Sequence, residues 1–397
     1  MLSWVSRRCG EAKHQAAPFS KGRRTPDAER KRAGRRSGAE HGRHGHRRPP
    51  EDCDEDLVAP LPELCPHCGC AELELRDWAE QFQDELVAAV VRRRFVVAKG
   101  RCASCKRSVR GRHPKQSSDA LGAAGTTLGP KAVALAAWLH YGCGVSAVKV
   151  ARLFAELGLA VTPGGITGAL LRLSDDADGT YDALVAALRA SPVVSPDETG
   201  WRIDGERGWL WVFVGDAVTV YDIALGPGAR GFDTAAKTLG EEYSGIICRD
   251  GWAPYRRFTN ATHQSCVAHL LRRANEMIAD SVAGQARIPH AVCRLLGDAM
   301  ALRARRDAAQ IGGQAPEGAI AELEVRLDRL LAAKVTHQPN RRLLAHLRTE
   351  GDALFSFLRH AGVPATNHEA ERAIRPQVCM RKNWGGNKSE DGARAAA

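Results

Sequence analysis

Two short apolar runs in this sequence each lead into an aspartate. Val193–Pro196 precedes Asp197, and Ile246–Arg249 precedes Asp250, which a glycine follows at once. Because β-branched residues before an acid and a glycine are typical of a buried strand and its exit, we expect each strand to end at its aspartate. Two such carboxylates side by side would form a site for a hard divalent cation, which can activate a hydroxyl group for phosphoryl chemistry.

A third carboxylate comes from a stretch near the end of the chain. Thr366 with Glu369 three residues later forms a capping box, so a helix is expected to start there, and Pro376 should limit its length. Glu371 and Arg375 lie one turn apart on that helix. An intrahelical salt bridge is the ordinary interpretation of such a pair. The alternative is that Glu371 is the third carboxylate of the metal site, with the arginines facing phosphate.

The elements that position these acids follow from the pattern around them. Trp209–Val214 is a second β-type run, and residues 204–208 between the runs predict a hairpin turn. Since successive residues of a strand point to opposite faces, Glu198 should point away from Asp197, toward solvent. We therefore assign Glu198 no catalytic role.

Two CxxC pairs precede this region. They contribute Cys65, Cys68, Cys102 and Cys105. Each pair can turn tightly enough to give two thiolates to one ion, and four thiolates complete a closed tetrahedral zinc site. The strand-like run Phe95–Val97 stands just before the second pair, as in a zinc ribbon. Cys70 and His67 are alternative ligands, and four unrelated thiols are the competing interpretation.

Charge is concentrated at the start of the chain. Residues 1–50 hold fourteen Lys and Arg against four Asp and Glu, whereas all 397 residues hold 57 against 46. This leader lacks apolar periodicity, so we expect it to be disordered, either as an arm attracted to nucleic-acid phosphates or as a solvated extension. The longest stretch without formal charge, residues 132–148, is too short to span a membrane, and no secretory signal is visible. We expect a soluble cytoplasmic protein.

Helical periodicity fills two segments. Lys131–His140, Ser146–Leu157 and Ile166–Leu173 are expected helices, and the last two resemble a helix-turn-helix, although any helical hairpin gives this pattern. Residues 276–350 read as a helical insertion without strand signals. Between these segments, Cys266 and His269 are three residues apart. These two residues could bind a metal, or they could pack in the core or line the active site. We favour packing or lining, because two ligands are too few to hold a metal ion.

The combined motifs resemble those of transposases of the insertion sequence 66 family. The match rests on Asp-Glu-Thr-Gly at 197–200, Asp-Gly-Trp-x-x-Tyr at 250–255 and Asn-x-x-x-Glu-Arg-Ala-Ile-Arg-Pro at 367–376, followed by Arg-Lys-x-x-Gly-Gly-Asn at 381–387. That family also has an N-terminal double-CxxC module, and its relatives among such transposases carry a Cys-x-x-His motif after the second aspartate. Its members usually begin with a coiled coil and continue beyond residues 392–394, so a truncated copy is an expected alternative.

The resemblance implies an α/β catalytic core with a ribonuclease-H-like mixed sheet. It places a DDE triad on Asp197, Asp250 and Glu371, which would hold two Mg²⁺ or Mn²⁺ ions, and it makes Arg372, Arg375, Arg381 and Lys382 candidates for positioning DNA phosphates. The expected organisation is a leader at 1–60, a zinc-binding module at 61–112, a helical DNA-binding segment at 113–190, the core at 191–275, a helical insertion at 276–350 and the rest of the core at 351–397.

The implied activity is Mg²⁺-dependent cleavage at the ends of an insertion sequence and joining of the freed 3′-hydroxyl to target DNA. The expected partner is DNA, on which the protein would assemble as a homo-oligomer. Helper proteins of the same element are further expected partners, and the expected location is the bacterial nucleoid. The alternatives are an inactive truncated copy that acts as a zinc-dependent repressor, or a ribonuclease-H-like nuclease that cuts without joining.

Overall fold

The computed structural model describes residues 62–64, 67–68, 70–72, 89–101, 103–105, 107–118, 128–282, 284–308 and 316–397. The chain divides into two compact units, 1–87 and 88–397, and every described helix and strand belongs to the second. The predicted basic leader at 1–60 and two of the predicted zinc ligands, Cys65 and Cys102, lie outside the described residues.

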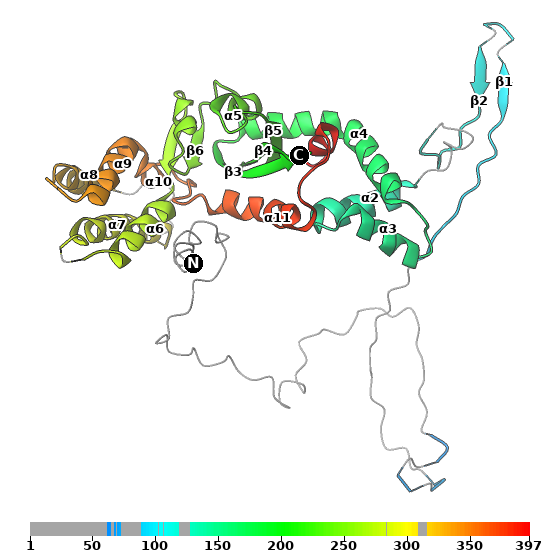
Figure 1. Cartoon of the computed structure of the whole chain (residues 1–397), viewed down its shortest axis with the longest axis horizontal. Helices are drawn as coiled ribbons and strands as arrows, with labels where there is room; N and C mark the ends of the chain where they lie inside the picture. The colour runs from blue at the N-terminus through cyan, green and yellow to red at the C-terminus, as the bar shows by residue number, and fades with distance from the viewer. Residues whose placement is uncertain are drawn as a thin grey trace, which may run out of the picture. The chain divides into compact units, whose positions relative to one another are not determined.

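A five-stranded mixed sheet forms the centre of the second unit (Figure 1). Its strands are β3 (Val193–Ile203), β4 (Glu206–Val214), β5 (Thr219–Leu225), β6 (Ile246–Arg249) and β7 (Thr262–Ser265). Their order is β5-β4-β3-β6-β7, in which β3, β4 and β5 are antiparallel neighbours and β6 and β7 run parallel to β3. This mixed topology is compatible with the predicted ribonuclease-H-like core.

Strand β3 is longer than the sequence predicted. It pairs with β4 from Ser195 opposite Val214 to Ile203 opposite Glu206, so it passes through Asp197 instead of ending there. The ladder with β4 continues because the hairpin closes only at Asp204 and Gly205, which both have positive φ, and not across the five residues expected. The prediction for the other acid is confirmed, since β6 ends at Arg249, directly before Asp250.

Helices cover both faces of the sheet. One face packs Trp211 and Phe213 against α4 (Pro163–Ala190) and α5 (Phe232–Leu239). The other packs Leu210 and Val212 against α11 (His368–Trp384), which contributes Ala370, Ile374 and Val378. Successive side chains of β4 point to opposite faces of the sheet and so belong to two separate apolar cores. Asp197 lies on the face that α11 covers, so this helix can bring a side chain to it.

Helix α11 differs from its prediction at both ends. Asn367 is the N-cap, and the Thr366 hydroxyl contacts His368 Nδ1, so no capping box with Glu369 forms. Pro376 lies inside the helix, which continues to Trp384 and stops at Gly385 with φ 85°. A proline removes a single N–H donor, and the packing of the buried Val378 and Met380 beyond it keeps the helix intact. The first four residues of the Arg-Lys-x-x-Gly-Gly-Asn motif, 381–384, are therefore helical.

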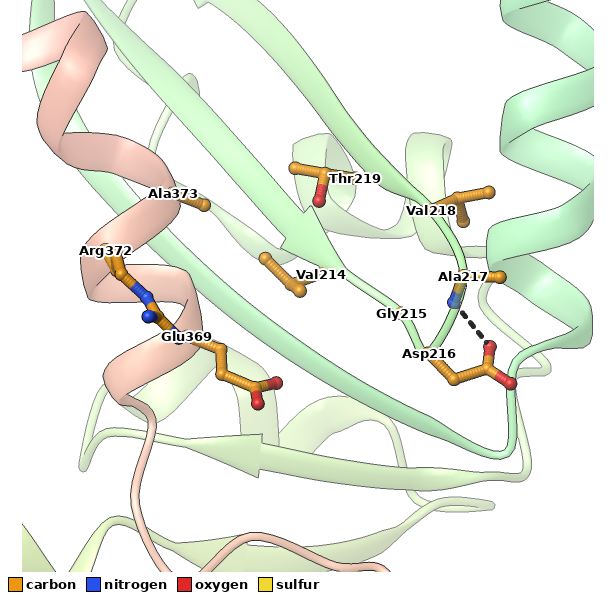
Figure 2. A pocket seen from close by; sticks show the side chains of 9 residues that line it. All are labelled: Val214, Gly215, Asp216, Ala217, Val218, Thr219, Glu369, Arg372 and Ala373. Atoms are coloured by element: carbon orange, nitrogen blue, oxygen red, sulfur yellow. Dashed lines mark hydrogen bonds between the residues drawn. The ribbon is translucent and has the colours of Figure 1, made fainter. Parts of the chain in front are cut away.

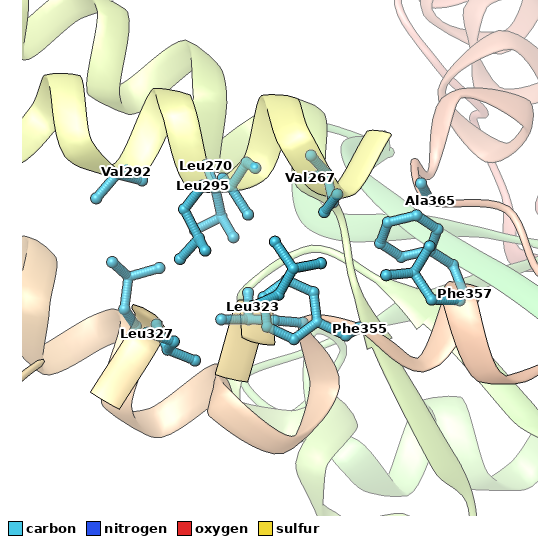
Figure 3. Packing of buried hydrophobic residues seen from close by; sticks show 14 of the residues in the cluster. Val267, Leu270, Val292, Leu295, Leu323, Leu327, Phe355, Phe357 and Ala365 are labelled. Atoms are coloured by element: carbon cyan, nitrogen blue, oxygen red, sulfur yellow. The ribbon is translucent and has the colours of Figure 1, made fainter. Parts of the chain in front are cut away.

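The helices that follow β7 are α6 (Val267–Ala279), α7 (Arg287–Ala308), α8 (Glu317–Leu331), α9 (Gln338–Glu350) and α10 (Ser356–Arg359). They enclose an apolar cluster in which Leu270, Leu295 and Leu323 meet Phe355 (Figure 3). The helical insertion predicted at 276–350 contains α7, α8 and α9. Within 276–350, the described residues contain no strand, as the pattern predicted.

The segment before the sheet is also helical. Helix α2 (Pro130–Ala137) continues as the π-helix η3 (Trp138–Gly142), and α3 (Ala147–Glu156) then packs with α4 around Phe154 and Leu170. The prediction for α4 was too short, because the second half of this helix packs Val185 and Leu188 against the sheet. No described helix is long and apolar enough to cross a membrane.

A two-stranded antiparallel hairpin, β1 (Lys99–Arg101) and β2 (Ser108–Arg110), precedes these helices. The predicted strand at 95–97 is wrong by a few residues, since β1 begins only at Lys99. The second CxxC pair occupies the connection between β1 and β2.

Candidate active site

The two aspartates follow neighbouring parallel segments of the sheet. Strands β3 and β6 pair with Val194 opposite Ile247; three residues further along the chain in each case come Asp197, which lies within β3, and Asp250, which directly follows β6. The ladder stops before Pro196, which has no N–H to donate, so the strands are free to separate where the acids lie. Backbone amides orient both carboxylates, because Glu198 N–H donates to Asp197 Oδ1 at 2.9 Å and Trp252 N–H donates to Asp250 Oδ1 at 2.8 Å.

Glu371 reaches this region from the first turn of α11. The N-cap residue Asn367 ties that turn to the sheet, since its side-chain amide donates to the carbonyl of Pro196 at 2.7 Å. The Asn367 N–H donates to Cys266 Sγ at 3.2 Å, which ties the same turn to the start of α6. Asn367 is buried. It therefore fixes the helix that carries Glu371 to the peptide that precedes Asp197, a role that the sequence pattern did not reveal.

The three acids share one electrostatic environment. Burial, together with the negative charges of Glu198, Asp250 and Glu371, raises the pKa of Asp197 to about 7, against the opposing effect of the hydrogen bond from Glu198 N–H. A bound cation offsets the free-energy cost of ionising a buried carboxyl group beside other negative charges. The donor set, all hard carboxylate oxygen, fits Mg²⁺ or Mn²⁺.

His269 lies beside the third carboxylate. Its Nε2 is 3.5 Å from Glu371 Oε1, and it also contacts the thiol of Cys266, which raises the pKa of His269 against the effect of burial. Burial opposes ionisation of Cys266, but His269 and the Asn367 N–H outweigh it and lower the pKa of this thiol. The structure therefore puts His269 next to Glu371 and Cys266 next to Asn367, and a role of this pair in lining the site stays a prediction.

A buried ion pair between Arg249 and Glu350 holds the backbone of Asp250. Arg249 Nη1 donates to Glu350 Oε2 at 2.7 Å and to the carbonyl of Asp250 at 2.9 Å, and Arg256 Nη1 donates to Glu350 Oε1 at 2.9 Å. Glu350 ends α9, so the helical insertion reaches the strand end that carries the second acid. His346 of the same helix covers Gly251, where a Cβ would stand 2.6 Å from the imidazole Cε1.

The solvent-facing assignment of Glu198 is wrong. Glu198 does point to the face opposite Asp197, since it stands across from Trp211 whereas Asp197 stands across from Val212. That face is covered, however, and the Glu198 side chain is 2% exposed. The Glu-Thr-Gly run gave no signal for this burial, because the residues that bury Glu198 lie 32 and 57 positions away.

The four predicted phosphate contacts have different surroundings. Arg372, Arg375 and Lys382 are exposed on α11, whereas Arg381 is half-buried and uses Nη1 on the Gly200 carbonyl and the Thr199 hydroxyl of β3. The structure thus spreads them along the helix that carries Glu371.

A cleft of about 450 Å³ lies beside the triad, between α11 and the turn that joins β4 to β5 (Figure 2). Arg372 and Glu369 line it from the helix, and Asp216 lines it from the turn, where its carboxylate points away from α11 and accepts from Ala217 N–H at 3.0 Å. None of the three triad carboxylates lines this cleft, so the cleft is separate from the predicted magnesium site.

The structure describes all three residues of the predicted magnesium site but only two of the four predicted zinc ligands. Among the described residues, no group of three or more His, Cys, Asp or Glu side chains is arranged to hold a metal ion. Like-charged carboxylates repel one another, so closer approach of the triad needs a cation between them. Of the predicted zinc ligands, Cys68 and Cys105 are described and exposed, and the zinc site stays a prediction.

The raised pKa of Asp197 predicts how stability depends on pH. Between the value of 3.8 for a free side chain and about 7, the folded chain binds more protons than the unfolded chain, so the free energy of unfolding should fall as pH rises through this window. The loss should reach roughly 4 kcal/mol. Thermal melts from pH 4.5 to 8, without added divalent metal, should show a steeper decline for the wild type than for Asp197→Asn, and Mg²⁺ should restore stability above pH 7. Superimposable profiles of the two proteins would contradict the assignment.

A five-stranded mixed sheet with one acid on β3, a second directly after the parallel strand β6 and a third on the helix that covers the sheet is compatible with a ribonuclease-H-like core. A family model described as transposase, IS66 family, matches residues 125–395. The chain therefore belongs to the IS66 family of transposases, which suggests a DNA-processing enzyme acting in transposition. No curated protein matches the chain.

Proposed function

We propose that this protein is a DDE transposase that cleaves DNA at the ends of an insertion sequence and transfers the freed strand to target DNA. The observation that supports the proposal is the effect of the charges of Asp250 and Glu371 on the raised pKa of Asp197, with Asp197 on β3, Asp250 directly after the parallel strand β6 and Glu371 in the first turn of α11. Family membership supports the same activity.

Asp197, Asp250 and Glu371 would hold the Mg²⁺ ions, which, when bound, activate the attacking hydroxyl and stabilise the leaving oxygen. The chain's own contribution is to orient the acids. Backbone N–H groups hold the two aspartates by one oxygen each, and Asn367 holds the turn from which Glu371 extends. Water or a DNA 3′-hydroxyl serves as nucleophile, so no covalent bond between protein and DNA is needed.

Arginine and lysine side chains of α11 are the proposed DNA contacts. Arg372, Arg375 and Lys382 are exposed on the helix that carries Glu371, and a cation there can neutralise phosphates next to the reacting one. Arg381 donates hydrogen bonds from Nη1 to Thr199 and Gly200 of β3, and we propose that its other N–H groups donate to a DNA phosphate.

The double-CxxC module is proposed to hold one structural Zn²⁺ through Cys65, Cys68, Cys102 and Cys105. The hairpin of β1 and β2 supports this, because the second CxxC pair falls in its connection, as in a zinc ribbon. The module and the helices α2 to α4 are the proposed end-binding part of the protein.

Full-length protein incubated with labelled element ends and Mg²⁺ tests the function. We expect nicked ends followed by joined products, and one zinc per chain by elemental analysis of protein purified without chelators. Cleavage without joining would support a ribonuclease-H-like nuclease instead. Binding of the ends without any cleavage would support an inactive copy acting as a repressor, and absence of zinc would remove the metal module.

A further inference from the structure

Glu198 is a buried carboxylate with both oxygens in use. Its Oε1 accepts from Arg230 Nε at 3.0 Å and Nη2 at 2.8 Å, and its Oε2 accepts from the Tyr255 hydroxyl at 2.6 Å. A carboxylate so little exposed is stable only when it is paired and hydrogen-bonded. The arrangement thus ties β3 to two distant segments, the loop that contains Arg230 and the turn that contains Tyr255.

Both connections lead to the segment that follows Asp250. Tyr255 lies in the 3₁₀ helix η4 (Ala253–Arg257), and its ring is buried against Trp211. Trp252 stacks on Arg230, with the guanidinium carbon 3.8 Å from the indole centroid. The N–H of the same Trp252 donates to Asp250 Oδ1. Glu198 therefore reaches the second aspartate by way of Arg230 and Trp252.

Arg230 is itself held on two sides. Its guanidinium carbon is also 4.4 Å from the ring centroid of Trp209 on β4, so two indole rings flank the guanidinium while two of its nitrogens fork onto Glu198. A flat, delocalised cation can stack between rings and still donate two hydrogen bonds in its own plane, here both to Glu198 Oε1, which a lysine ammonium cannot. This fixes the direction from which Arg230 holds Trp252.

The first aspartate is tied to the same residue. The backbone N–H of Glu198 donates to Asp197 Oδ1, so the peptide whose side chain anchors the 250–257 segment also orients the first carboxylate. We propose that Glu198 is a positioning residue that sets the distance between Asp197 and Asp250 and thereby the affinity of the triad for its divalent cation. This inference rests on the proposed function, in that the triad binds a metal.

The test compares Glu198→Gln and Tyr255→Phe with wild-type full-length protein. The amide keeps the size of Glu198 but removes the charge that holds Arg230, and the phenylalanine removes only the hydroxyl that reaches Oε2. Glu369→Gln is the matched control, because it removes an exposed carboxylate close in sequence to Glu371. Two properties are measured: hydrogen exchange of residues 250–257 without metal, and Mn²⁺ binding from the electron paramagnetic resonance signal of the free ion.

We expect Glu198→Gln to exchange faster in residues 250–257 and to raise the Kd for Mn²⁺ by about 10-fold to 100-fold, the usual effect of losing an outer-shell partner. Tyr255→Phe should also speed exchange and raise the Kd for Mn²⁺, but by smaller factors. If Glu198→Gln does not fold, Tyr255→Phe still tests the proposal. Binding of element ends, measured by fluorescence anisotropy, should be unchanged, which excludes general unfolding.

Wild-type exchange and wild-type Mn²⁺ affinity in both variants would overturn the proposal. Faster exchange with unchanged Mn²⁺ affinity would overturn it too, because Glu198 would then be only structural. If the wild type binds no Mn²⁺, the proposed function fails separately, and the exchange of residues 250–257 alone decides whether Glu198 positions this segment.

Discussion

Replacing any one of Asp197, Asp250 and Glu371 by its amide is expected to lower strand cleavage by orders of magnitude while binding of element ends persists. Asn and Gln keep the size and most hydrogen bonds of the acids but remove the charge that holds a divalent cation. In Asp197→Asn, the oxygen that accepts from Glu198 N–H can be retained, so the backbone of β3 should not change. Cleavage of labelled ends in Mg²⁺, together with an anisotropy assay of binding, measures the two effects separately.

Glu369→Gln is the control for the third acid. Glu369 is exposed and lines the cleft between α11 and the β4–β5 turn (Figure 2). Glu371 instead lies 3.5 Å from His269 Nε2, and its charge contributes to the raised pKa of Asp197. The control should cost at most ~1 kcal/mol of stability and leave cleavage largely intact, because an exposed carboxylate contributes little. Loss of cleavage in Glu369→Gln but not in Glu371→Gln would show that the third ligand is misassigned.

The acids of the candidate site could be located from the sequence because each has a local signal. Asp250 follows an apolar run that does form a strand, and Glu371 follows a helix start that the sequence placed within a residue or two. The extent of the elements was harder to predict. Pro376 argued for a short helix and Asp197 for a short strand, but packing against the sheet and the ladder with β4 outweighed these local preferences.

The residues that hold the acids in place carry no local signal. Glu198 depends on Arg230 and Tyr255, and Asn367 depends on Pro196, 171 positions earlier in the chain. Arg249 meets Glu350 across 101 positions. Alternation within a strand gives the face on which a side chain lies but not what covers that face, so burial of Glu198 could not be inferred from its neighbours. Pairing between distant charges is decided by the tertiary fold alone.

The pair of Arg249 and Glu350 leads to the second large expected effect. Both side chains are at most 2% exposed, and Glu350 accepts from Arg249 and Arg256 with one oxygen each. In Glu350→Gln the buried guanidinium of Arg249 loses its counter-charge, and removal of one partner of a buried pair costs about 3–5 kcal/mol. For a unit of about 310 residues, with an entropy of unfolding of about 2.1 cal/mol/K per residue, the melting temperature should fall by about 5–8 °C.

Asp298→Asn provides the matched control, because Asp298 pairs with Arg326 at 2.6 Å with its side chain 57% exposed. An exposed pair contributes at most about 1 kcal/mol, so this variant should melt close to the wild type. Glu350→Gln should in addition weaken Mn²⁺ binding, since Arg249 also donates to the Asp250 carbonyl and would lose its fixed position. Equal melting temperatures of the two variants would show that α9 does not stabilise the strand end. A large loss of stability with unchanged Mn²⁺ affinity would confine the role of Glu350 to folding and leave the placement of Asp250 to Trp252 and Glu198.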